Sequence, residues 1–121
     1  MTFLPTAATP LSVCLQLTHA INRSDRFEDI YEAALDALES GLAVEKASIL
    51  FFDPDAVMRF KAWRKLSDGY RRAVEGHTPW APGVKGAEPI VVSDVTGNPE
   101  LAPLLQTIRA ERIAALAFIP L

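Results

Sequence analysis

The first part of the chain carries apolar residues at helical spacing. Its first stripe consists of Leu11, Cys14, Leu15, Thr18 and Ile21. Intervals of three and four residues predict a helix that runs from Pro10 to about Asn22. Thr9 is a residue type that caps helices, and a proline in the first helical position completes the start signal.

A second, stronger helical pattern begins at Asp25. Glu28 follows three residues later, and this pair is the sequence signature of a capping box. Gly41 stands where the helix is expected to end. The apolar stripe between these signals is broad and comprises Phe27, Ile30, Tyr31, Ala34, Leu35, Leu38 and Leu42.

The middle of the chain changes to β-type patterns. Residues 47–52, rich in β-branched and aromatic side chains, predict a buried strand. The sequence Asp53-Pro54-Asp55 predicts a turn, and residues 58–66 return as an alternating strand. The two strands should therefore form an antiparallel hairpin.

The remaining elements are shorter. Ser67 should cap a helix that ends near Gly76, and residues 77–89 contain the prolines and glycines of a loop. Residues 90–95 predict a strand, Asn98 starts another helix, and residues 113–121 predict a final apolar strand. This order predicts an α+β domain built on a mainly antiparallel sheet.

Composition narrows the class of protein. The chain has 121 residues, of which 50% are hydrophobic, and a net charge of −3. These values predict one soluble globular domain over residues 11–121, after a disordered lead-in at residues 1–10. Scattered basic residues do not favour nucleic acid, and no apolar run is long enough for a membrane span. The amino-terminal sequence lacks the features of a secretory signal. The single cysteine fits a protein of the reducing cytoplasm.

Few residues suggest catalysis, a metal or a cofactor, and we expect none of the three. His19 and His77 lack partners at metal-ligand spacing. Cys14 lies on the apolar stripe of the first helix, where a cysteine is usually a buried, unreactive side chain. Asp53 and Asp55 are explained by the predicted turn rather than by a metal site.

The candidate ligand site is an aromatic cluster around the long loop. Its members are Trp63, Tyr70, His77 and Trp80. Ligand pockets are mostly apolar with a few polar groups that fix orientation, and these side chains supply both. The alternative is that the aromatic rings only hold the loop against the sheet, and the sequence favours this second interpretation.

Four segments together resemble a GAF domain. They read IYEAALDALESGLAVEKASILFFD, MRFKAWRKLSDGYRRAVEGHTPW, PIVVSDV and AALAFIPL. The resemblance is greatest to GAF domains of bacterial multidomain sensor histidine kinases, and it implies a GAF/PAS-like sheet covered by helices. It also implies that the family's final strand and helix are missing here. The chain lacks the sheet and loop cysteines of relatives that reduce methionine sulfoxide or attach bilins, and the N-K-x-F-D-E-type motif of cyclic-nucleotide binders.

The resemblance implies a sensory or regulatory module of a two-component system. It would bind an unknown small molecule or relay a conformational change to a downstream kinase domain in the parent protein. The alternative is a structural dimerisation and relay module without a ligand, paired through its N-terminal helices. Exposed apolar positions on the first helix would favour the alternative, and an open cavity at Trp80 would favour the sensor.

Overall fold

A computed structural model describes residues 9–121 of the chain, so most of the predicted lead-in lies outside the described residues. The described chain divides into two compact units. Unit 1 contains the residues up to Phe51 together with Phe60–Lys65, and unit 2 contains Phe52–Arg59 and Leu66–Leu121. The secondary structure mixes helices with short strands, which confirms the predicted α+β class.

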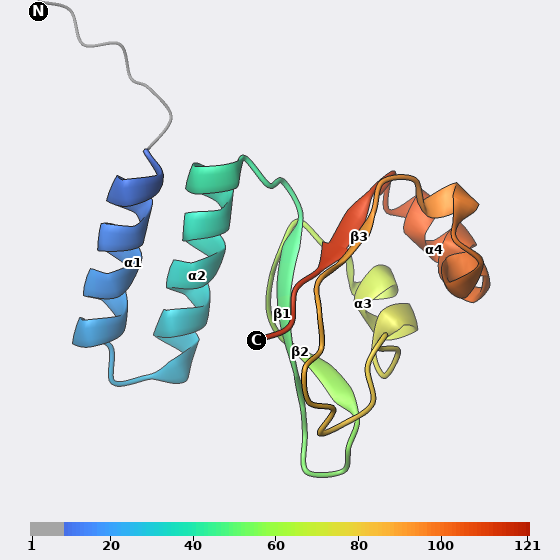
Figure 1. Ribbon diagram of the computed structural model, residues 1–121, viewed down its shortest axis with the longest axis horizontal. Helices are drawn as coiled ribbons and strands as arrows, with labels where there is room; N and C mark the ends of the chain where they lie inside the picture. Colours follow the sequence, from blue (N-terminus) through green and yellow to red (C-terminus); the bar gives the residue numbers. More distant parts are fainter. Residues whose placement is uncertain (1–8) are drawn as a thin grey trace, which may run out of the picture. The chain divides into compact units, whose positions relative to one another are not determined.

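Unit 1 begins with two helices that lie side by side, α1 (Pro10–Arg23) and α2 (Phe27–Leu42) (Figure 1). Thr9 caps α1 as predicted, because its side-chain oxygen accepts a hydrogen bond from the Ser12 N–H at 3.2 Å. Strands β1 (Ala47–Phe52) and β2 (Met58–Arg64) follow and pair with each other, which confirms the predicted hairpin.

The start of α2 differs from the prediction. Arg26 occupies the N-cap position and makes no side-chain capping bond, so the prediction of a capping box at Asp25 and Glu28 is wrong. Because the helix starts at Phe27, Glu28 is its second residue, whereas a capping box needs the acid at the third. Glu28 instead lies 3.8 Å from the Arg26 guanidinium.

The end of α2 shows why Gly41 is glycine. The helix continues to Leu42 and ends at Ala43, whose φ of 53° is left-handed. A Cβ atom on Gly41 would lie 3.3 Å from Val13 Cγ1 of α1. Gly41 therefore permits the close approach of the two helices rather than ending α2, which was its predicted role.

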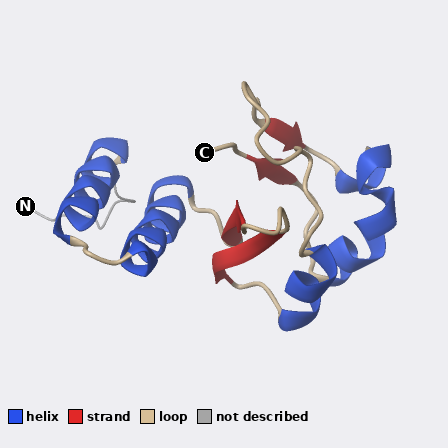
Figure 2. Ribbon diagram, turned by 90° about the horizontal axis from the view of Figure 1, so that it is seen from below, coloured by secondary structure: helices blue, strands red, loops and turns tan. Residues whose placement is uncertain are grey.

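Unit 2 contains the short elements of the second half of the chain (Figure 2). They are α3 (Asp68–Val74), β3 (Ile90–Val92), the 3₁₀ segments η1 (Val95–Gly97) and η2 (Pro99–Leu104), α4 (Leu105–Ala110) and β4 (Leu116–Phe118). Strands β3 and β4 run antiparallel, with Ile90 opposite Phe118. The core of the unit consists of Val92, Val95 and Ile108.

Two features of the fold depart from the sequence pattern. The helix expected after Asn98 begins as 3₁₀ structure, and Pro103 lies inside that segment, where it cannot donate a helical hydrogen bond. In addition, the strands form two separate two-stranded sheets, β1 with β2 and β3 with β4, where we expected one. Alternation along a strand predicts its two faces but does not identify its neighbours.

Candidate functional site

The structure distributes the four aromatic candidates over both units. Trp63 lies on β2 within unit 1 and is 38% exposed. The other three belong to unit 2. Tyr70 is half-buried on α3 and packs against the core cluster of that unit. His77 is exposed, and its backbone N–H donates to the Val74 carbonyl at 2.9 Å.

Trp80 contacts a residue that the sequence analysis did not include in the site. Its ring meets the ring of Phe118 edge-on, with the centroids 6.5 Å apart. The Thr78 hydroxyl accepts a hydrogen bond from the Trp80 N–H at 3.2 Å and donates to the Trp80 carbonyl at 3.1 Å. The ring contact joins the loop to β4, as the second interpretation of the aromatic residues requires, whereas the two hydrogen bonds lie within the loop. A ligand role for the cluster stays a prediction.

Tyr70 lies near a pair of hydrogen bonds that join the start of α3 to the end of α4. Glu111 accepts hydrogen bonds from the Ser67 N–H at 2.8 Å and from the Ser67 hydroxyl at 2.6 Å. The Ser67 hydroxyl also accepts from the Tyr70 N–H at 3.1 Å, which confirms the predicted cap of α3. Burial, with the nearby Glu111 charge, raises the pKa of the Tyr70 phenol. The phenol is therefore a neutral, partly desolvated donor in this unit.

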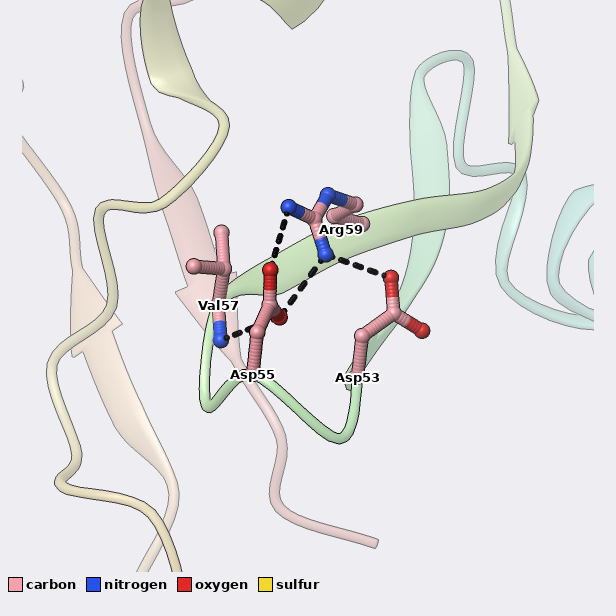
Figure 3. A network of polar contacts seen from close by, with 4 residues as sticks. All are labelled: Asp53, Asp55, Val57 and Arg59. Atoms are coloured by element: carbon pink, nitrogen blue, oxygen red, sulfur yellow. Dashed lines mark hydrogen bonds and ion pairs between the residues drawn. The ribbon is translucent and has the colours of Figure 1, made fainter.

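The acid pair at residues 53–55 has a structural partner that the sequence analysis missed (Figure 3). The Arg59 guanidinium lies 2.8 Å from Asp53 Oδ2 and contacts both carboxylate oxygens of Asp55 at 2.9 and 2.8 Å. Asp55 Oδ1 also accepts from the Val57 N–H at 3.1 Å. Arg59 holds the pKa of Asp55 below its usual value. The predicted turn is confirmed, and its carboxylates stabilise the turn.

The prediction that Cys14 is buried on the core side of the first helix is wrong. Cys14 is exposed, whereas the neighbouring Val13 is buried at 8% exposure. The physical reason is that α1 carries two apolar stripes. The stripe that faces α2 contains Val13, Leu17 and Ala20, which line a cavity of about 150 Å³ together with Ala33 and Ala37 of α2.

The other stripe of α1, which we name the α1 outer face, consists of Leu11, Cys14, Leu15, Thr18 and Ile21. Its large apolar side chains are open to solvent: Leu11 is 70% exposed, Leu15 56% and Ile21 44%. No member of the face is charged. A contiguous exposed apolar patch of this kind is typical of a protein contact surface.

The chain is similar to a solved structure from Sinorhizobium meliloti 1021. That structure is a domain of a protein provisionally identified as a two-component sensor histidine kinase. The two chains share 46% sequence identity with a TM-score of 0.73, and the match covers 81% of this chain. It covers 66% of the other chain, so the protein described here spans less than two thirds of that domain.

Two further comparisons found no match. No family model matches the chain, and no curated protein matches it significantly. The chain is thus similar to a domain of a sensor histidine kinase, whereas the GAF resemblance stays an expectation from the sequence. In the described part of the chain, no helix has both the length and the apolar character required to cross a bilayer.

Proposed function

We propose that the chain is a signal-transduction module of a sensor histidine kinase, related to GAF domains, which relays conformational change between two copies through α1. It would contribute no catalysis of its own and would act in the cytoplasm on a kinase domain of the parent protein. The observation that carries this proposal is the α1 outer face, taken together with the sensor-kinase relative.

A second copy is the partner that fits this face best. The exposed leucine and isoleucine side chains of the α1 outer face would each stabilise a contact by about 1.5–3 kcal/mol if fully buried. Lack of charge on the face removes the desolvation cost that would oppose helix-to-helix packing. In a symmetric pair the same patch serves both copies, so one apolar face is sufficient.

A small-molecule sensor remains the second candidate. Within unit 2, the half-buried Trp80 and Tyr70 supply large apolar surfaces with polar tips, and His77 is exposed in the loop after α3. Trp63 belongs to unit 1, where it is 38% exposed. Ligand binding would transmit a signal only if the paired and unpaired states differed in affinity for the ligand. The first candidate function therefore depends on the α1 outer face, and the second depends on the aromatic residues.

Sedimentation equilibrium of the 121-residue chain tests the pairing. We expect concentration-dependent dimers, and we expect Leu15→Glu to shift the protein to monomers because pairing would bury an unpaired charge. Val84→Glu is the matched control, since Val84 is 51% exposed in the loop of unit 2. This control should still dimerise.

Two results would reject the pairing. One is a wild-type chain that remains monomeric throughout the accessible concentration range. The other is equal weakening of the dimer by Leu15→Glu and Val84→Glu, which would show a general effect of charge. A small molecule that binds the wild-type chain, and binds the Trp80→Ala variant more weakly, would instead support the sensor.

A further inference from the structure

A cavity of about 320 Å³ in unit 2 contains two arginines that the proposed function does not use. Three short segments line it: the start of η1, the last turn of α4 with its exit, and the approach to β4. The lining residues are Asp94, Val95, Thr96, Arg109, Arg112, Ile113 and Ala114. None of the four aromatic candidates is among them, so this cavity is a separate candidate site.

Backbone hydrogen bonds fix the apolar wall of the cavity. Val95 is 2% exposed, and its N–H donates to the Ala114 carbonyl at 2.9 Å. The Ile113 N–H donates to the carbonyl of Ile108, which belongs to the core, at 3.2 Å. A ligand would therefore meet a wall that is already ordered, which lowers the entropy cost of binding.

Arg112 occupies a backbone position that suits glycine better. Its φ is 62°, and its N–H donates to the Arg109 carbonyl at 2.9 Å where α4 ends. Such left-handed helix ends are usually glycine, because a Cβ atom is unfavourable there. The backbone conformation therefore does not explain why this residue is an arginine. Its guanidinium group is the part of the side chain that could bind a ligand.

The charges of the cavity do not balance. Two exposed arginines and one carboxylate, Asp94, line it, and Asp94 Oδ1 already accepts from the Thr96 N–H at 2.9 Å and the Thr96 hydroxyl at 2.6 Å. These bonds, with a smaller contribution from Arg109, keep the pKa of Asp94 low. Within residues 9–121 neither Arg109 nor Arg112 forms an ion pair. One positive charge is left for a ligand.

We propose that this cavity binds a small organic anion, with its oxygens on Arg109 and Arg112 and its apolar part against Val95 and Ile113. The planar guanidinium presents paired N–H donors that match the oxygens of a carboxylate or a phosphate monoester. Both ligand types share this anionic head. The cavity volume suits a ligand of a few carbon atoms.

An NMR titration of the full chain at constant ionic strength tests the proposal with three probes. Butyrate and methyl phosphate carry the anionic head, and butyramide is the neutral control. We expect at least one anion to produce saturable shifts at the amides of Thr96 and Ile113, while butyramide produces none. The anion that binds more tightly identifies the head group.

Arg112→Gly separates binding from folding. Because glycine suits the left-handed backbone, this variant should fold at least as well as the wild type by thermal unfolding, yet bind the anion at least about tenfold more weakly. Arg72→Gln, which removes an exposed arginine of α3, should bind like the wild type. Anion shifts unchanged in Arg112→Gly, or no shifts beyond those caused by chloride, would overturn the proposal.

Discussion

Helix α1 of unit 1 and the core of unit 2 differ in how they bury their apolar side chains. Unit 2 is built from short elements, with three residues in β3 and six in α4, yet Val92, Val95 and Ile108 are at most 6% exposed. In unit 1, α1 has fourteen residues and a complete N-cap, but Leu11 and Leu15 stay mostly exposed. Element length and good capping therefore do not show which side chains a fold buries.

The largest expected effect concerns the core of unit 2. Ile108→Ala removes a buried side chain, and the lost contacts plus the cavity should lower the free energy of unfolding by about 2–5 kcal/mol. Leu15→Ala on the α1 outer face is the comparison. Measured by urea unfolding in dilute solution, it should change stability by less than about 0.5 kcal/mol. Equal losses would contradict the difference between the α1 outer face and the core of unit 2.

The second prediction concerns the contact between α1 and α2. Gly41→Leu would force a side chain against Val13 and should cost about 1–3 kcal/mol of stability. Gly69→Ala is the control, because a Cβ atom on Gly69 of α3 meets no atom within 4 Å. Urea unfolding should show the control to be as stable as the wild type or slightly more stable. A harmless Gly41→Leu would mean that the helices do not approach closely there.

The third prediction compares equivalent helix ends in the two units. Ala43 ends α2 and Arg112 ends α4, and their φ values of 53° and 62° are both left-handed. Replacement of either residue by glycine should raise the free energy of unfolding by about 0.5–1 kcal/mol, the relief of strain less the entropy cost of glycine. Thermal unfolding of the two variants is the measurement. Destabilisation by Arg112→Gly would show that its side chain supports the fold.

The smallest expected effect is a pH dependence. The pKa of Asp55 lies below its unfolded value of 3.8, chiefly because Arg59 bonds the ionised form. The contribution of this carboxylate to stability is therefore complete above pH 3.8 and disappears as the pH falls through the lower folded pKa. Stability measured by urea unfolding from pH 5 downward should fall less steeply in Asp55→Asn. An identical slope would contradict a folded-state role for this ion pair.

Local signals in the sequence predicted local structure well. Thr9 and Ser67 cap helices in the structure because a capping bond involves only neighbouring residues. The turn at Asp53 and Asp55 is confirmed for the same reason, although the contribution of Arg59 was not foreseen. These three signals involve only residues that are close in the chain, so the amino-acid sequence was sufficient to predict them.

Two local signals failed, the capping box at Asp25 and the helix end at Gly41. The other failures concern choices between distant partners. Periodicity in α1 identified one apolar stripe, but only the packed structure shows that the Val13 side faces α2. Pairing of β3 with β4, and of Trp80 with Phe118, joins segments far apart in the chain. The arginine-lined cavity was missed for the same reason, since scattered basic residues converge only in the fold.

The rate at which a maleimide labels Cys14 tests the central claim most directly. Cys14 is the one cysteine of the chain and lies exposed on the α1 outer face. If two copies pair through this face, labelling should be fast in dilute protein and slow progressively as concentration rises, by mass action. Leu15→Glu should label at the fast rate at every concentration. A wild-type rate that is independent of concentration, where sedimentation shows dimers, would place the pairing surface elsewhere and contradict the account.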